Sequence, residues 1–231
     1  MSNASELAKL NAQIIRCRKC PRLVVYREKV AEVKRRAFSE WDYWGKPVPG
    51  FGDPAAKLVI LGLAPAAHGA NRTGRMFTGD RSGDFLYKAL YEAGFASQPT
   101  SVRRDDGLAL ADAFISATAR CAPPDNKPLP SELDNCRPYF ERDLAILKPR
   151  AILALGGIAM RAYLGVLKSR GQIKSLAPYP FWHGASFACP APLPRLFASY
   201  HPSQQNTFTG RLTEAMLRDV LLDIRKYLRK A

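Results

Sequence analysis

The sequence predicts an α/β fold, a three-layer α/β/α sandwich with a mostly parallel central four-stranded sheet. Two observations support this prediction. Short apolar runs alternate along the chain with longer stretches of helical periodicity, which is typical of strands that lie parallel in one sheet beneath covering helices. The 231 residues contain no internal repeat, low-complexity tract or long linker, so we expect one domain spanning residues 1–231.

Four apolar runs are the expected strands. The first, at 57–63, is a continuous aliphatic stretch followed by alanine, proline and glycine, as expected of a buried strand that ends in a loop. The other three runs have the same character and lie at 114–118, 151–155 and 195–200.

Helical stretches lie between and after these runs, at 82–93, roughly 132–147, 158–167 and 212–230. Ser131 and Asp134 have the spacing of a capping box, so we expect them to begin the second helix. Pro138 lies inside that helix, where its ring and its missing N–H predict a kink or a delayed start.

The unusual polar segments follow three of the expected strands, at 64–80, 119–127 and 201–206. In parallel sheets of this kind, ligands bind at the carboxyl ends of the strands. We therefore expect one functional face at this edge of the sheet.

The composition is strongly basic, with 35 Lys and Arg against 20 Asp and Glu and a formal net charge of +15. A positive field of this size favours a phosphate backbone as the partner and disfavours a hydrolase of small nucleotides. No run approaches the ~20 apolar residues of a membrane span, and the N-terminus lacks the apolar core of a signal peptide. We expect a monomeric cytoplasmic protein that associates with the nucleoid and not with membranes.

Five cysteines are present, an odd number that argues against a disulfide framework in a reducing compartment. Cys17-x-x-Cys20 is a two-ligand clamp, and Cys121 and Cys136 form a second pair. Four thiolates suit either tetrahedral zinc or an iron–sulfur cluster, and in both cases the role is structural. The alternative is that the second pair consists of ordinary buried thiols, as we expect for Cys189.

A glycine-rich loop at 64–80 delivers an aromatic ring and a carboxylate, Phe77 and Asp80. A pocket for an extruded base needs a face to stack on and an acceptor that holds a water. From the sequence alone, Asp80 could equally cap the helix that follows.

His201 lies at the carboxyl end of the last strand and begins a polar turn at 201–206. At this position it could donate a hydrogen bond to a departing base as negative charge develops on that base.

Together these motifs resemble the uracil-DNA glycosylase superfamily, and most closely its family 5, the type B enzymes of bacteria and archaea. The resemblance covers about residues 14–228. The matching stretches are Cys17-x-x-Cys20-Pro-Arg-Leu, Pro47-Val-Pro-Gly-Phe-Gly-Asp-Pro54, Gly62-Leu-Ala-Pro-Ala-Ala-His-Gly-Ala-Asn-Arg-Thr-Gly-Arg75, Phe77-Thr-Gly-Asp80, Arg120-Cys-Ala-Pro-Pro and Ser199-Tyr-His-Pro-Ser.

The resemblance implies roles for individual residues. Asp80 matches the aspartate of the catalytic loop, Phe77 the base-stacking aromatic residue and His201 the histidine of the second motif. Asn126 matches a polar residue at the border of the same pocket, and we count it with the catalytic residues. The resemblance also implies a [4Fe–4S] cluster on Cys17, Cys20, Cys121 and Cys136, and substrate contacts by Gly62, Ala64, Ser203 and Asn206.

Ala117 is an informative departure from the related family 4, in which an asparagine reads the edge of uracil. Loss of that amide should relax discrimination between bases, because a polar pocket group selects mainly by being left unpaired with the wrong base. The expected substrates are therefore DNA containing uracil and DNA containing other deaminated bases, such as hypoxanthine or xanthine.

The expected function is a DNA glycosylase of base excision repair that hydrolyses the N-glycosidic bond. Lys and Arg bind the phosphates, the lesion base rotates out of the duplex, and the loop at 201–206 fills the gap. The alternative is a non-catalytic iron–sulfur DNA-binding module of the same fold. The presence of Asp80 together with His201 counts against that alternative.

Overall fold

Six strands form the central sheet of the computed structural model, which describes residues 2–230, and their order across the sheet is β1-β3-β2-β4-β6-β5. The four inner strands run parallel. Short antiparallel strands add to both edges, because β1 pairs with β3 and β5 pairs with β6. The strands are β1 (Phe51–Gly52), β2 (Leu58–Gly62), β3 (Ala113–Ala117), β4 (Ala151–Leu155), β5 (Ser186–Phe187) and β6 (Arg195–Ser199).

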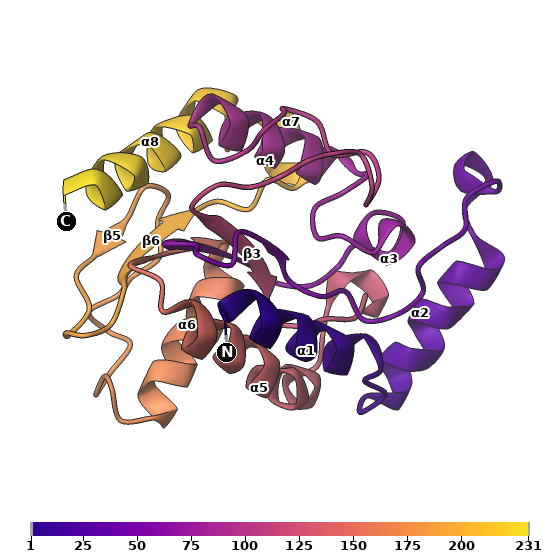
Figure 1. The fold of residues 1–231 in the computed structure, drawn as a ribbon, viewed down its shortest axis with the longest axis horizontal. Helices are drawn as coiled ribbons and strands as arrows, with labels where there is room; N and C mark the ends of the chain where they lie inside the picture. The colour runs from indigo at the N-terminus through magenta and orange to yellow at the C-terminus, as the bar shows by residue number, and fades with distance from the viewer. Residues whose placement is uncertain (1, 231) are drawn as a thin grey trace.

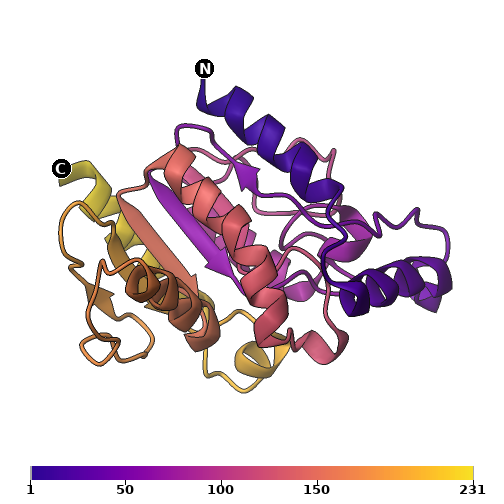
Figure 2. The same ribbon diagram turned by 90° about the horizontal axis from the view of Figure 1, so that it is seen from below.

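Helices cover both faces of this sheet (Figures 1 and 2). Helices α4 and α8 pack on one face, whereas α1, α5 and α6 pack on the other. Helix α2 projects beyond the sheet at the right of Figure 1. The helices are α1 (Asn3–Ile15), α2 (Pro21–Val33), η1 (Arg36–Phe38), α3 (Ala70–Thr73), α4 (Arg81–Glu92), η2 (Pro124–Asn126), α5 (Pro130–Leu147), α6 (Gly157–Ser169), α7 (Gln204–Phe208) and α8 (Glu214–Lys230).

Strand β2 divides the molecule into two cores. Leu58 and Ile60 belong to the core under α4 and α8, whereas Val59 and Leu61 belong to the core under α5 and α6. Alternate side chains of a strand point to opposite faces of a sheet. Because both faces are covered, all residues of β2 and β4 are buried, and their sequences are continuous apolar runs.

The predicted three-layer architecture is confirmed, and the four predicted strands form the centre of the sheet. The prediction of only four strands was incomplete, because β1 and β5 extend the sheet at its edges. These two strands have two residues each. An alternating pattern needs about four residues to be recognised in a sequence, so such short strands leave no signal.

Helix α5 begins earlier than its expected capping box, so the prediction for Ser131 and Asp134 was wrong. Leu129 is the N-cap residue, and its N–H donates to the Glu132 carboxylate at 2.7 Å. Pro130 occupies the first helical position, where proline is favoured because its missing N–H has no role there.

Pro138 lies within α5 and does not delay its start, because the helix begins at Pro130 and continues past Pro138 to Leu147. This part of the expectation for Pro138 was wrong.

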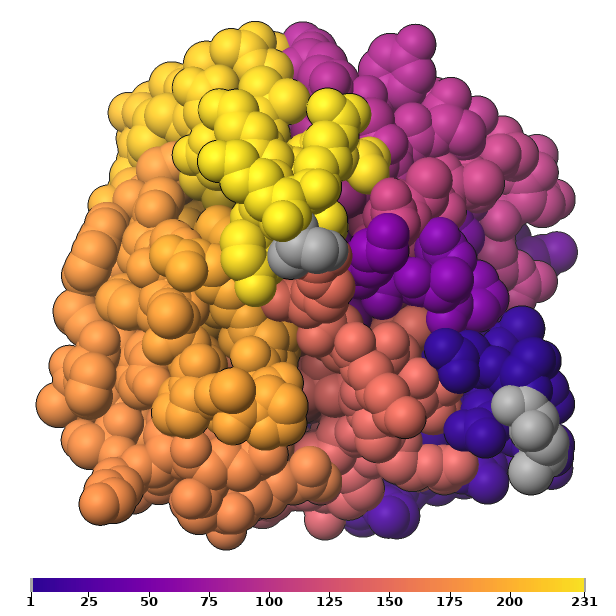
Figure 3. Space-filling model, turned by 60° about the vertical axis from the view of Figure 1, so that its left-hand side comes forward, coloured from indigo at the N-terminus to yellow at the C-terminus, as the bar shows by residue number. Residues whose placement is uncertain are grey.

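Two helices near the N-terminus, α1 and α2, were not predicted. Leu7, Leu10 and Ile14 are the buried positions of α1, and this helix lies beside α5 (Figure 2). In Figure 3 the N-terminal segment (indigo) and α8 (yellow) occupy different parts of the surface, with residues from the middle of the chain between them. Within residues 2–230, every helix is too short or too polar to cross a membrane.

Candidate active site and cysteine pocket

A pocket of about 660 Å³ opens at the carboxyl ends of the parallel strands, and we call it the base pocket. Gly62, Ala117 and Leu155, which end β2, β3 and β4, line it, and His201 enters it just after β6. The predicted polar segments therefore meet at one edge of the sheet, and the function of that edge stays a prediction. The predicted site residues that line this pocket are Gly62, Ala64, Phe77, Asp80, Ala117, Asn126, His201 and Ser203.

Phe77 forms an aromatic wall of the base pocket. Its backbone is left-handed, with φ of 53°, a conformation that is rare for a bulky residue and occurs mostly at functional sites. The ring lies over Gly62, where a Cβ atom would come within 3.0 Å of the Phe77 Cζ atom. The centroid of the His201 ring lies 5.9 Å away, with the two planes tilted by 35°. Gly62 therefore leaves the space that the Phe77 ring occupies.

Asp80 is both the N-cap residue of α4 and a wall of the base pocket. Its Oδ1 atom accepts a hydrogen bond from the Gly83 N–H at 2.9 Å. The carboxylate lies against Gly69, where an added Cβ atom would be 1.8 Å from Oδ2. Burial raises the pKa of Asp80, and the hydrogen bond from Gly83 opposes this shift. Asp80 is thus both a helix cap and a pocket residue, the two alternatives that the sequence left open.

The turn after β6 holds His201 at the pocket. The Asn206 side-chain amide donates to the His201 carbonyl at 2.8 Å, and the Ser203 hydroxyl caps α7. Burial lowers the pKa of His201 to about 4, so the imidazole is neutral near pH 7 and can donate one hydrogen bond. Asn206, which we expect to contact substrate, braces this turn and does not line the base pocket, so its substrate contact stays a prediction.

Asn126 and Ala117 differ in their depth in the base pocket. Asn126 is exposed on η2, and both it and Asp125 have positive φ angles of 56° and 53°. Ala117 is 2% exposed at the end of β3, where it pairs with Gly62. Asn126 therefore belongs to the rim and Ala117 to the floor of the pocket.

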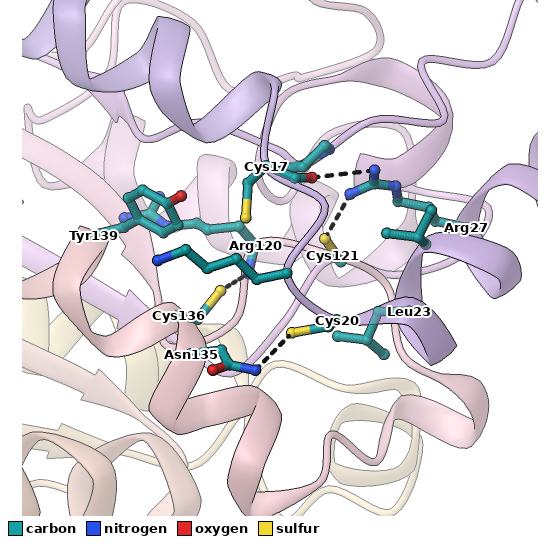
Figure 4. Close-up of a pocket in the computed structure, with 12 residues that line it drawn as sticks. Cys17, Cys20, Leu23, Arg27, Arg120, Cys121, Asn135, Cys136 and Tyr139 are labelled. Carbon is teal, nitrogen blue, oxygen red and sulfur yellow. Dashed lines mark hydrogen bonds between the residues drawn. The ribbon is translucent and has the colours of Figure 1, made fainter.

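The four cysteines of the two predicted pairs line a second pocket, which we call the cysteine pocket (Figure 4). Cys17 follows α1 and Cys20 is the N-cap residue of α2, whereas Cys121 follows β3 and Cys136 lies in α5. Figure 4 shows their sulfur atoms spread around one space. Within residues 2–230, no group of three or more cysteine, histidine or acidic side chains has the spacing to hold a metal ion.

Three of these four sulfur atoms accept hydrogen bonds from N–H groups. The buried Arg27 guanidinium donates to Cys121 Sγ at 2.9 Å, and the Asn135 amide donates to Cys20 Sγ at 3.5 Å. The backbone N–H of Arg120 donates to Cys136 Sγ at 3.3 Å. Donors of this kind stabilise thiolate ligands.

Burial raises the pKa of Cys121 to about 11 and that of Cys136 to about 12. The positive charge and hydrogen bond of Arg27 oppose the shift at Cys121, and the hydrogen bond from Arg120 opposes it at Cys136. As free thiols, both side chains would therefore be protonated at neutral pH.

A buried ion pair fixes the segment that leads into Cys121. The Arg120 guanidinium bonds to the Asp143 carboxylate and to the Ser116 hydroxyl, which itself donates to Asp143 at 2.7 Å. Arg120 and Asp143 are almost wholly buried, and removal of one partner of such a pair is strongly destabilising. The pair ties the end of β3 to α5 and so fixes the relative positions of Cys121 and Cys136.

Arg27, Asn135 and Asp143 were not predicted as site residues. One signal for Arg27 was available: it lies four residues after Leu23 on α2, so both side chains share one helix face. Both are buried. The partners of Asn135 and Asp143 lie far along the chain, and the sequence offers no local pattern for them.

The chain is similar to known proteins over most of its length. The family model for the Uracil DNA glycosylase superfamily matches residues 49–225. The chain is 52% identical over 225 residues to the type-5 uracil-DNA glycosylase of Mycobacterium leprae, covering 96% of both chains. It is 50% identical over 211 residues to that of Thermus thermophilus, covering 91% of this chain and 93% of the relative.

A type-4 uracil-DNA glycosylase of Pyrobaculum aerophilum is also similar, with 33% identity over 168 residues, 72% of this chain and 69% of the relative. The type-5 relatives thus share more residues with this chain over a longer stretch. The family match over most of the chain and the near-complete coverage by type-5 relatives show that this chain belongs to the Uracil DNA glycosylase superfamily.

Proposed function

We propose that this protein is a type-5 uracil-DNA glycosylase that excises uracil and other deaminated bases from DNA by hydrolysis of the N-glycosidic bond, in base excision repair. The observation that carries this proposal is the base pocket. It gathers an aromatic ring, a buried carboxylate and a neutral imidazole at one sheet edge, and its volume suits a small organic group.

The strongly basic composition supports docking on DNA, because Lys and Arg bind phosphates without regard to sequence and with a strong dependence on salt. The lesion base then rotates into the base pocket at a cost of roughly a few kcal/mol, which is lower for mispaired bases. The turn at 201–206, braced by Asn206, fills the gap in the duplex.

In the pocket, each side chain has one task. Phe77 stacks on the extruded base, and His201 donates a hydrogen bond as negative charge develops on the departing base. Asp80 orients a water for attack on the sugar carbon and stabilises the cationic sugar. Asn126 at the rim contributes a polar contact to the same nucleotide.

Ala117 supports a broad range of bases. It gives the pocket floor a methyl group and no amide, so no buried polar group is left unpaired when a base other than uracil enters. Hypoxanthine and xanthine are therefore proposed substrates beside uracil.

We propose that Cys17, Cys20, Cys121 and Cys136 hold a [4Fe–4S] cluster. Each thiolate of such a cluster binds a different iron, so the four sulfur atoms need not lie close enough together to share a single metal ion. Four sulfur atoms face one space and three of them accept N–H donors, which is the donor chemistry of cluster thiolates. When bound, the cluster cross-links the N-terminal helices to β3 and α5 and takes no part in the hydrolysis. The chain's own residues carry out every step of base removal.

The decisive experiment incubates purified protein with oligonucleotides that contain one uracil, hypoxanthine or xanthine, followed by cleavage at abasic sites. We expect excision of all three bases. No release of any base would favour a non-catalytic DNA-binding module, and release of uracil alone would contradict the proposed role of Ala117.

A second measurement tests the cluster. Anaerobically purified protein should be brown and contain about four iron and four sulfide per chain. Colourless protein with one zinc per chain would contradict the cluster while leaving the glycosylase proposal intact.

A further inference from the structure

A second cavity, of about 790 Å³, adjoins the base pocket, and we call it the side basin. Asp80, Arg81 and Asn126 line both cavities, so the side basin opens beside the carboxylate that we assign to the chemistry. Ala66 and Gln204 also line both cavities. The residues that line the side basin alone include Arg35, Phe38, Trp41, His68 and Arg72.

Arg72 is the buried cation of the side basin, with 3% of its surface exposed. Its Nε atom donates to the His68 carbonyl at 2.8 Å, and its Nη2 atom donates to the Gly79 carbonyl at 2.6 Å. The buried Nη1 atom has no hydrogen-bond partner among the described residues. Buried N–H groups are nearly always paired, so an unpaired one needs an explanation.

Two aromatic rings hold this guanidinium in place. Its Cζ atom lies 3.9 Å from the centroid of the Phe38 ring and 4.0 Å from that of Trp41. Such contacts stabilise a cation that has lost its water. Because the surroundings are poorly screened, the charge of Arg72 acts more strongly on a nearby anion than an exposed charge would.

Arg35 and His68 complete a basic end of the basin. Arg35 is exposed, and the His68 Nδ1 atom hydrogen-bonds with the Tyr43 hydroxyl at 3.1 Å. Burial lowers the pKa of His68, and the positive charges of Arg35 and Arg72 lower it further. The charges that act on His68 are thus cationic, an arrangement that an anion would relieve.

The carboxylates of the basin lie toward the base pocket. Asp80 borders both cavities, Asp84 lies one helical turn further along α4, and Asp125 precedes the shared residue Asn126. The basic end at Arg35, His68 and Arg72 therefore lies close to these carboxylates, because the charges of Arg72 and Asp80 act on each other.

We propose that this basic end binds the backbone phosphate next to the extruded nucleotide. The inference rests on the proposed function, because it takes Asp80 to act on the sugar of that nucleotide. The strand must then leave the sugar through a neighbouring phosphodiester. The side basin opens beside Asp80 and offers a buried charge for that phosphate. Arg35 and His68 contact the phosphate, and Arg72 supplies the fixed charge.

The test uses uncleavable DNA, so that binding is measured apart from catalysis. One linkage at a time, on either side of the lesion analogue, is replaced by a neutral methylphosphonate. We expect one replacement to weaken binding of the wild-type protein by roughly three- to tenfold, the size of one lost phosphate contact. Arg35→Gln should weaken binding to unmodified DNA similarly, reduce the salt slope by about one, and lose sensitivity at that linkage.

Arg229→Gln is the matched control, because it removes one exposed positive charge on α8. It should keep the sensitivity at that linkage. His68→Gln is a second variant and should reduce the same sensitivity. Equal linkage patterns in the wild type and in Arg35→Gln would overturn the proposal.

A free anion is the other source of the same chemistry. If inorganic phosphate at constant ionic strength protects the wild type but not Arg35→Gln from thermal unfolding, while the linkage scan shows no difference, the site takes free phosphate and the DNA assignment is wrong. These outcomes differ from failure of the proposed function, which would appear as no release of any base by the wild-type protein while the binding pattern persists.

Discussion

The cysteine pocket and the base pocket contrast in how their functional atoms are held. In the cysteine pocket, three sulfur atoms accept N–H donors and the segment before Cys121 is fixed by the Arg120–Asp143 pair. In the base pocket, Phe77 and Asn126 have left-handed backbones and line a large open space. The first region is closed and held by many hydrogen bonds, and the second is strained and open. Some buried atoms of the first region, such as Arg27 Nε and Asp143 Oδ1, still lack a hydrogen-bond partner among the described residues.

This difference indicates how the molecule separates stability from chemistry. Buried hydrogen bonds and ion pairs, such as Arg120–Asp143, hold one conformation, and removal of one partner of a buried ion pair is strongly destabilising. Strained backbone persists only where the surrounding structure holds it, and it concentrates at functional sites. We therefore expect substitutions in the base pocket to change rates, and substitutions in the cysteine pocket to change the free energy of unfolding.

The largest rate effect is expected at Asp80, and the variant of choice is Asp80→Asn. Asparagine is as good an N-cap residue as aspartate, so the hydrogen bond to the Gly83 N–H should remain while the charge is lost. Single-turnover excision should slow by about 10²–10⁴-fold, as for removal of a general base.

Asp84→Asn, in the first turn of the same helix, is the matched control and should keep a near-normal rate. If Asp80→Asn also cleaves normally, Asp80 is only a helix cap and the contrast between the two regions is lost.

His201→Ala should slow excision by about 10²–10³-fold, as for removal of one donor to a developing anion. His183→Ala is its control, because His183 contacts Tyr200 but is not among the residues that line the base pocket. Thermal unfolding of both variants shows whether either loss reflects unfolding. A normal rate for His201→Ala would remove His201 from the chemistry.

The pH dependence of the wild-type rate follows from the pKa shifts of the same two residues. Burial raises the pKa of Asp80, so protonation should begin to stop the reaction at a pH above the usual aspartate value of about 4. His201, with a pKa of about 4, stays neutral above that range. We expect the rate to fall as the pH drops through the raised pKa of Asp80, with no separate step from His201 near pH 6.5. A step near pH 6.5 that disappears in His201→Ala would show that His201 titrates normally.

Ala117→Asn should shift preference toward uracil by about tenfold or more, because its amide pairs with uracil and is left unpaired with other bases. Ala117→Leu is the control, because leucine is similar in size to asparagine and carries no amide. It therefore separates the effect of side-chain shape from that of hydrogen bonding. The measurement is the ratio of excision rates for uracil and hypoxanthine. Equal ratios in both variants would attribute selectivity to volume alone.

The smallest rate effect is expected at the cysteines. Cys17→Ala should lower the iron content and the unfolding temperature, while the rate of the fraction that stays folded remains near normal. Cys189→Ala is the control, because Cys189 lies outside the cysteine pocket. This variant should retain all its iron. A large rate loss in folded, iron-containing Cys17→Ala would show that the two regions are coupled.

The centre of the fold could be predicted because its pattern is local. Strand β4 matches the predicted run at 151–155, and the other inner strands differ from prediction by one or two residues. The edge strands β1 and β5 escaped because pairing with a neighbour, and not their own sequence, defines them. Helix α1 could have been recognised from Leu7, Leu10 and Ile14 at helical spacing.

The identity of most site residues could be predicted, but their contacts and backbone conformations could not. Eight of the expected residues meet in the base pocket, because strand ends carry them to one edge. The bracing role of Asn206 and the donors Arg27 and Asn135 depend on contacts that no spacing encodes. The left-handed backbone of Phe77 could not be predicted either, because glycine and asparagine are the residues that usually indicate this conformation, and neither occupies the position.

The hydrogen bond between Arg27 and Cys121 joins residues 94 positions apart, and that between Asn135 and Cys20 joins residues 115 apart. During synthesis, Cys17 and Cys20 therefore leave the ribosome long before their partners exist. Over that interval the N-terminal helices lack these hydrogen-bond partners, and Leu23 and the thiols of Cys17 and Cys20 are exposed. The order in which the chain is made would thus place assembly of the proposed cluster late, after residue 136 has emerged, and would leave the exposed thiols open to oxidation until then.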